Sequence, residues 1–239
     1  MKYKVIACKV IARELYQLAF ENSNIIDIVL LQQALHNEPD KLRNMIQQTI
    51  DTIEAEEETY DAILLGYGLC SNGIVGIQSK KYPIVVARGH DCITLLLGSK
   101  EKYHDIFNSN NGGIYWYSPG WIEHSSMPGK ERFDQCYAEY TEKYGEDNAD
   151  YLMEMEQSWL TEYKCAYYID WGIEENKKHI DYTKECADFL DWEFRMEKGS
   201  NLLLKDMLEG NWDNERFLFI PPNTTIEPSY DETVIKKKD

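Results

Sequence analysis

The sequence lacks several features that mark particular classes of protein. No window approaches the run of about 20 apolar residues that a membrane-spanning helix needs. The N-terminal apolar stretch is broken by Lys9 and Arg13, so no secretory signal is predicted. Basic residues are scarce, with 25 lysines and arginines against 42 aspartates and glutamates, which gives a net charge of −17. Because such a chain repels phosphate backbones and anionic lipid surfaces, we expect no nucleic-acid or membrane partner and a cytoplasmic location.

Familiar short motifs are missing as well. No two cysteines form a CxxC pair, and the segment GYGLCSNG (residues 66–73) has neither the GxGxxG spacing nor the lysine of a phosphate-binding loop. A nucleotide-binding fingerprint is therefore not predicted. What is present is material for a core, since 43% of the residues are hydrophobic and 13% aromatic, together with six cysteines. In a reducing compartment these cysteines indicate metal binding or reactivity rather than structural disulfides.

Short apolar runs alternate with amphipathic segments along the chain. We expect strands at residues 3–8, 24–31, 60–66, 82–88, 113–118, 166–172 and 216–222, with a short one inside 191–200. We expect helices at residues 10–22, 35–57, 92–107, 177–192 and 201–210, and one or two helices within 129–162. This alternation predicts an α/β fold with a mainly parallel, Rossmann-like sheet and flanking helices.

The alternation of strand and helix signals predicts one α/β domain over residues 1–239 that ends in a charged tail at 229–239. It is also compatible with two similar halves, 1–112 and 113–228, around a cleft. No residue-level repeat proves such halves.

Chemistry-bearing residues follow the first five expected strands. In open α/β sheets ligands bind outside the carboxyl ends of the strands. We therefore expect the five loops to open on one edge of the sheet. They carry, in chain order, Cys8, His36, Cys70, the segment RGHDC (88–92) and Trp121.

Thiols and imidazoles at one edge predict a metal site. Cys8, Cys70 and Cys92 would be three protein ligands that leave one position open, as in catalytic zinc sites, and His36 or His90 would complete the shell. Three cysteines from separate loops suit an iron–sulfur cluster equally well. The accompanying histidines favour zinc, but the residues alone also allow no metal, with the thiols packed as small core side chains.

The neighbours of these thiols have predicted roles in the same site. His90, Asp91 and Arg88 are the candidate catalytic residues, with Asp91 orienting an imidazole and Arg88 holding a carboxylate or another anion. Tyr67 and Gly68 are candidate ligand-binding residues, since glycine allows close approach of the backbone.

Trp121 is a further candidate ligand contact. In the alternative reading the cleft is a non-catalytic module that binds a small ligand or cofactor through Trp121, Tyr67 and His36. The remaining thiols, Cys136, Cys165 and Cys186, are predicted to serve packing. His104 and His179 are predicted to lie at the surface.

Several short motifs resemble a known family. They are LHNEPDKL, ILLGYGLCSNG, RGHDCITLLLGS, GIYWYSPGWIEH and LEGNWDNERFLFIPP. In this order they look like the family of domain of unknown function 1638, over a stretch from Cys8 to about residue 220. One departure is Ala87, where that family usually has proline. The positions that carry over are Cys8, His36, Cys70, Arg88, His90, Asp91 and Cys92.

The resemblance implies an anaerobic bacterial or methanogen-like setting near corrinoid-dependent methyl transfer. It attaches no firm activity to the chain. The partner it implies is a small-molecule ligand or a corrinoid or methyltransferase protein.

Overall fold

The computed structural model describes residues 1–33, 35–173 and 176–238, except for the side chain of His36. The chain forms two compact units. The first consists of Met1–Tyr103 and Gly199–Asp239, and the second of His104–Lys198. This division differs from sub-halves 1–112 and 113–228, because the last part of the chain returns to the first unit and completes its sheet.

The first unit contains a five-stranded sheet in the order β2-β1-β3-β4-β8. These strands are β2 (Ile25–Leu31), β1 (Lys2–Cys8), β3 (Ala62–Gly66), β4 (Ile84–Ala87) and β8 (Phe217–Ile220). The first four run parallel and β8 runs antiparallel to β4. β3 and β4 are buried along their whole length, which is typical of parallel strands covered on both faces. The predicted mainly parallel α/β fold is confirmed.

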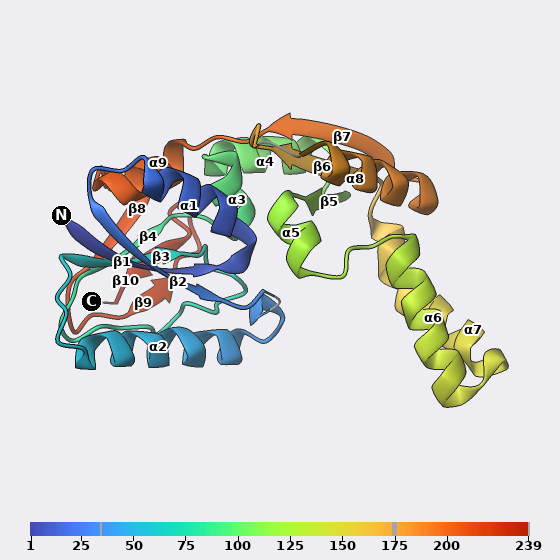
Figure 1. The fold of residues 1–239 in the computed structure, drawn as a ribbon, viewed down its shortest axis with the longest axis horizontal. Helices are drawn as coiled ribbons and strands as arrows, with labels where there is room; N and C mark the ends of the chain where they lie inside the picture. Colours follow the sequence, from blue (N-terminus) through green and yellow to red (C-terminus); the bar gives the residue numbers. More distant parts are fainter. Residues whose placement is uncertain (34, 174–175, 239) are drawn as a thin grey trace. The chain divides into compact units, whose positions relative to one another are not determined.

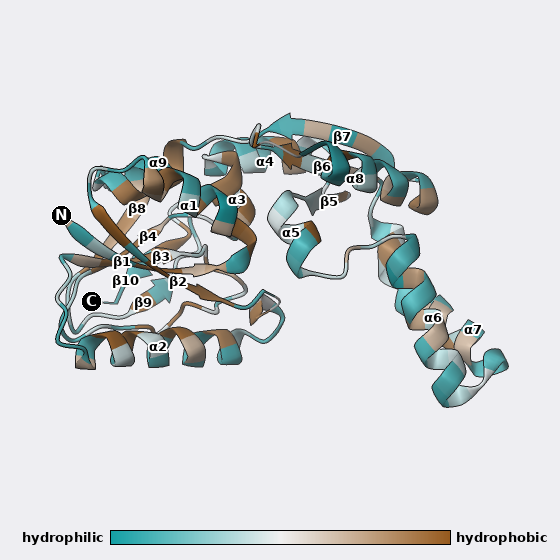
Figure 2. Cartoon of the chain, viewed as in Figure 1, coloured by the Kyte–Doolittle hydropathy of each residue, from teal (hydrophilic) through white to brown (hydrophobic). Residues whose placement is uncertain are grey.

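Helices cover both faces of this sheet (Figure 1). On one face lies α2 (Pro39–Ala55), which buries Leu42, Ile46, Ile50 and Ile53. On the other lie α1 (Ala12–Phe20), α3 (Cys92–Leu97) and α9 (Leu202–Glu209). Figure 2 shows hydrophobic colour along the strands and alternating colour along α2, as expected for a helix with one buried face. Short 3-10 turns at Lys9–Ile11 and Leu35–Asn37 follow β1 and β2.

The predicted helix at 92–107 is in fact two helices. Gly98 ends α3 in the left-handed conformation, with φ of 76°, and α4 (Lys100–Ser109) begins two residues later. A glycine in this conformation is a common helix end. In the described part of the chain, no helix has the length and apolar character needed to cross a bilayer.

The predicted charged tail contains structure. β9 (Ile226–Pro228) and β10 (Ile235–Lys237) pair antiparallel, and neither strand was predicted. Val234 and Ile235 are buried, so two apolar residues fix a segment whose other residues are mostly charged.

The second unit contains a parallel sheet in the order β5-β6-β7. Its strands are β5 (Ile114–Tyr117), β6 (Cys165–Asp170) and β7 (Glu193–Lys198). Its helices are α5 (Pro119–His124), α6 (Lys130–Tyr144), α7 (Glu146–Gln157) and α8 (Asn176–Leu190), with a 3-10 turn at Ser158–Glu162. Tyr117, Tyr168 and Trp192 belong to its core. Because β5 belongs to this separate sheet, the expectation that all five loops share one sheet edge is wrong.

Candidate functional site

The order of the first four strands defines a switch point in the sheet. From β1 the chain moves to β2 on one side, and it then returns to β3 and β4 on the other. In doubly wound sheets of this order, ligands bind outside the carboxyl ends of the strands where the direction reverses. Here that point lies between β1 and β3. Cys8 is the last residue of β1, and Cys70 lies four residues beyond the end of β3.

The loop that carries Cys70 is held in an unusual conformation. Cys70, Ser71 and Asn72 have φ values of 47°, 55° and 68°, in the left-handed region that non-glycine residues rarely adopt. Such residues cost on the order of 1–3 kcal/mol each and cluster at functional sites. The Cys70 N–H donates to the His90 carbonyl over 2.8 Å. The loop after β3 is thereby fixed to the loop after β4.

The third thiol stands at the start of a helix. Cys92 is the first residue of α3, and Asp91 caps that helix by accepting a hydrogen bond from the Ile93 N–H at 3.0 Å. The Tyr103 hydroxyl donates to the same carboxylate at 3.3 Å. Burial raises the pKa of Asp91, and the hydrogen bonds from the Ile93 and Thr94 amides and from the Tyr103 hydroxyl oppose that rise. The structure thus adds a capping role to the predicted orienting role of Asp91.

The three thiols lie close enough to influence one another. Burial raises the pKa of each, to about 12 for Cys70. After burial, Cys8 and Cys70 raise the pKa of Cys92 further, because neighbouring thiolates would repel each other. Backbone amides oppose this effect, with Val10 acting on Cys8 and Gly68 on Cys70. The site therefore holds three protonated thiols, each beside an amide that favours its thiolate form.

A tyrosine hydroxyl lies with these thiols. Tyr67 is 3% exposed, and its pKa is raised first by burial and then by Cys8, Cys70 and Cys92. Its hydroxyl has no hydrogen-bond partner among the residues that the structure describes. Buried polar groups are rarely left unpaired, so this hydroxyl needs a partner, which a water molecule or a bound molecule would supply.

Thr94 is a second such group, on the first turn of α3. Its hydroxyl is buried and unpaired within the same described part of the chain. It was not predicted, because it stands inside an apolar run that reads as core.

The close approach predicted for Gly68 is present. A Cβ atom there would lie 2.6 Å from the Asp91 nitrogen and 2.8 Å from the Gly89 oxygen. The loops after β3 and β4 therefore touch at a position that only glycine can occupy without displacement.

Other predicted site residues lie in different surroundings. His90 is exposed. Arg88 donates to the carbonyl oxygens of Asn214, Thr233 and Ile235, so much of its guanidinium holds the C-terminal segment. Trp121 belongs to α5 in the second unit. The side chain of His36 lies outside the described part of the structure.

Predictions for the remaining histidines and cysteines have mixed outcomes. His104 is exposed, as predicted. His179 is not at the surface but 4% exposed, and its Nε2 lies 3.2 Å from Glu123 Oε1. Cys165 and Cys186 are buried in the second unit, as packing residues would be.

The arrangement of the three thiols does not match a site for a single metal ion. Within residues 1–33, 35–173 and 176–238, no group of three or more His, Cys, Asp or Glu side chains is arranged to hold one. A single zinc ion would need its sulfur ligands about 3.8 Å apart, given Zn–S bonds of about 2.3 Å in a tetrahedron. The three thiols as they stand do not fit that small ligand set.

The fold and its switch point define a Rossmann-like α/β protein with a sulfur-rich candidate site at the carboxyl ends of its strands. The sequence model of the family described as "Protein of unknown function (DUF1638)" matches residues 30–208, and the chain belongs to this family. The match includes Cys70 and Cys92, whereas Cys8 precedes it. Neither a search of curated proteins nor one of solved structures gives a match.

Proposed function

We propose that the protein binds an iron–sulfur cluster through Cys8, Cys70 and Cys92. The observation that carries this proposal is the placement of three buried, free cysteines at the switch point of the sheet, where Cys8 ends β1, Cys92 begins α3, and the Cys70 N–H is hydrogen-bonded to the carbonyl two residues before Cys92. Such a grouping is unfavourable once the thiols ionise, unless a cation binds them. Soft thiolate ligands select iron–sulfur clusters, zinc and copper.

The local backbone supports thiolate ligands. The amide of Val10 favours the thiolate of Cys8, and the amides of Gly68 and Cys92 favour that of Cys70. Hydrogen bonds to the sulfurs tune metal–thiolate centres and orient their ligands. On binding a metal centre the thiols would release their protons to solvent, and the positive charge of the metal would offset the repulsion between the resulting thiolates.

A cluster makes a different geometric demand on its ligands from one zinc ion. In a cluster each cysteine binds a different iron atom, so the sulfurs stand farther apart than the ligands of a single ion. The sequence preference for zinc depends on the accompanying histidines; of these, His90 is exposed, and the side chain of His36 lies outside the described structure.

Three cysteines leave one iron of a cubane cluster open to another ligand. When bound, such a centre supplies a Lewis-acidic or redox-active iron. The unpaired Tyr67 hydroxyl lies with the same thiols and would hydrogen-bond a small molecule held there. A role in corrinoid-linked methyl transfer remains a prediction of the family resemblance.

The test is purification without oxygen, followed by assay of iron, acid-labile sulfide and visible absorption. Wild-type protein is expected to be brown and to contain both elements, and Cys70→Ser is expected to lose most of both. The matched control is Cys186→Ser, which removes a buried thiol of the second unit. Colourless wild-type protein without iron after reconstitution would refute the cluster.

A second candidate function is binding of a small molecule without metal. The orphan hydroxyls of Tyr67 and Thr94 favour it, because they need a partner whether or not metal is bound. In that case the protein contains neither iron nor zinc, and Cys70→Ser leaves the affinity for the small molecule unchanged.

A further inference from the structure

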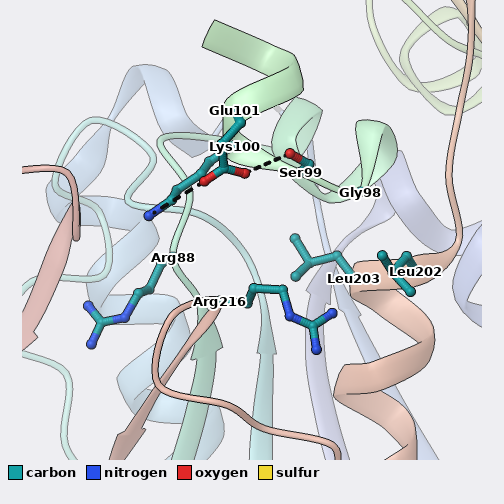
Figure 3. Close-up of a pocket in the computed structure, with 8 residues that line it drawn as sticks. All are labelled: Arg88, Gly98, Ser99, Lys100, Glu101, Leu202, Leu203 and Arg216. Carbon is teal, nitrogen blue, oxygen red and sulfur yellow. Dashed lines mark hydrogen bonds and ion pairs between the residues drawn. The ribbon is translucent and has the colours of Figure 1, made fainter.

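A separate pocket lies in the first unit, at the other end of α3 from Cys92. Its volume is about 230 Å³. It is lined by Arg88, Gly98, Ser99, Lys100, Glu101, Leu202, Leu203 and Arg216. Figure 3 shows Lys100 and Arg88 on one side of the pocket and the two leucines on the other. Six helical residues separate this pocket from the thiols, or about 9 Å at a rise of 1.5 Å per residue.

The lining is basic, although the chain as a whole is strongly acidic. Three lining side chains are cationic and one is a carboxylate, whereas the chain carries a net charge of −17. A locally positive pocket on an acidic protein attracts small anions and not extended polyanions, which the surrounding negative charge repels.

Two of the cations, Arg88 and Lys100, lie on the same side of the pocket in Figure 3, and both donate hydrogen bonds to uncharged backbone carbonyls. Arg88 donates to backbone carbonyls, and Lys100 Nζ donates to the Glu232 carbonyl at 2.9 Å. Partial burial lowers the pKa of Arg88, and the charge of Asp231 opposes that shift. The carbonyl contacts position both charges without neutralising them, and Lys100 also forms a longer ion pair with Glu101.

The remaining charges of the pocket are already compensated. Arg216 forms ion pairs with Asp206 and Asp213. Glu101 accepts a hydrogen bond from the Ser99 hydroxyl at 2.7 Å and lies 3.8 Å from Lys100 Nζ. Arg88 and Lys100 thus supply the positive charge that a bound anion would meet, with Glu101 as the opposing group.

A helix end adds to this charge. α9 begins at Leu202 in the pocket wall, with no side-chain cap and no acidic residue in its first turn. The N-terminus of a helix carries partial positive charge, although here the Leu202 N–H already donates to the Ser200 hydroxyl at 3.3 Å. The end of α3 also meets the pocket, but its Leu96 carbonyl is occupied by the Ser200 N–H at 3.0 Å.

We propose that this pocket binds a small molecule through an anionic oxygen group, a phosphate or a carboxylate. The volume lies below the roughly 300 Å³ at which pockets for drug-sized ligands begin, so the ligand is small. Leu203 offers a short apolar wall for the rest of that molecule. The site does not depend on the cluster proposed for the thiols.

The experiment titrates inorganic phosphate and, separately, acetate into the full-length protein. Binding is followed by calorimetry and by amide chemical shifts. We expect saturable binding of at least one anion in the millimolar range, with shifts centred on residues 98–101 and 202–204. The anion that binds more tightly identifies which source of the anionic group the pocket prefers.

Variants separate a built site from general charge attraction. Lys100→Gln is expected to weaken binding about tenfold or more, and Lys100→Arg is expected to retain it. The control Lys41→Gln removes an exposed lysine of α2 and should leave affinity unchanged. Cys70→Ser should also retain anion binding, which separates this proposal from the cluster.

Three results would overturn the proposal. The first is absence of saturable binding of both anions to wild-type protein. The second is chemical-shift changes outside the pocket alone. The third is equal weakening by Lys100→Gln and Lys41→Gln. The wild-type shifts decide the matter even if a Lys100 variant does not fold.

Discussion

Substitution of Gly68 by alanine tests the contact that holds two thiol-bearing loops together. The new methyl group would lie 2.6 Å from Asp91 N and 2.8 Å from both Asp91 Cα and Gly89 O. Ordinary contacts begin at 3.4 Å, so the loops must separate by about 0.8 Å at the closest contact. All three atoms belong to the backbone, which cannot move aside as a side chain can.

We expect Gly68→Ala to lower the free energy of unfolding by about 1–3 kcal/mol, the usual cost of overpacking. A functional constellation tolerates displacements of only about 0.5 Å. The separation of Cys70 from Cys92 should therefore reduce affinity for the metal centre by about 10- to 100-fold, as loss of other supporting contacts does.

The assay combines urea unfolding of metal-free protein with iron content after anaerobic reconstitution. Gly76→Ala is the matched control, because φ at Gly76 is +82° and nothing lies within 4 Å of the added methyl. It should cost about 1–2 kcal/mol through backbone strain and leave iron content unchanged. The reasoning is refuted if Gly68→Ala keeps full iron content, or if both variants lose iron equally.

Three other predictions concern single groups. Tyr67→Phe removes a hydroxyl without a partner among the described residues, so the unfolding free energy of metal-free protein should stay unchanged or rise by about 1 kcal/mol. Tyr60→Phe removes a hydroxyl that donates to Asp27 at 2.6 Å, so it should lower the unfolding free energy in the same urea assay. Burial raises the pKa of Cys70 to about 12, so above about pH 9 the thiol ionises in the unfolded chain but not in the folded protein. The metal-free protein should therefore lose at most about 1.4 kcal/mol of stability per pH unit from this thiol. A Cys70→Ser variant with an identical pH profile would contradict this. Glu54→Ala should cost about 1–3 kcal/mol, since Oε1 of this carboxylate accepts hydrogen bonds from the Ser79 hydroxyl and two backbone amides that the variant leaves without this acceptor; an unchanged urea midpoint would refute it.

The strands of the first unit were predictable because their apolar runs are continuous. The sequence signals at residues 3–8, 24–31, 60–66 and 82–88 each correspond to an observed strand. The short strands β9 and β10 were missed, because their pairing depends on burial of Val234 and Ile235 against the rest of the unit. Three-residue strands carry too little local pattern to be seen in sequence.

The assignment of strands to sheets was less accessible. A strand–helix rhythm continues unchanged past residue 113, although β5 starts a second sheet. No local sequence signal distinguishes a crossover within one sheet from the start of a second sheet. For this reason the sequence predicts Trp121 at the same sheet edge as the thiols, although it belongs to the second unit.

The gathering of Cys8, Cys70 and Cys92 followed from a topological rule, since parallel strands end at a common edge. The unpaired state of the Tyr67 hydroxyl could not be predicted from the sequence, because it depends on every neighbour in the folded protein. The burial of His179 had a visible signal. It begins a series with Thr183 and Cys186 at helical spacing, which places it on the buried face of α8.

The most direct measurement is a crystal structure of protein prepared without oxygen, with anomalous scattering recorded at the iron edge. We expect one iron–sulfur centre bonded to the Sγ atoms of Cys8, Cys70 and Cys92. An iron-free map in which these three sulfur atoms point away from a common centre would contradict the proposed function.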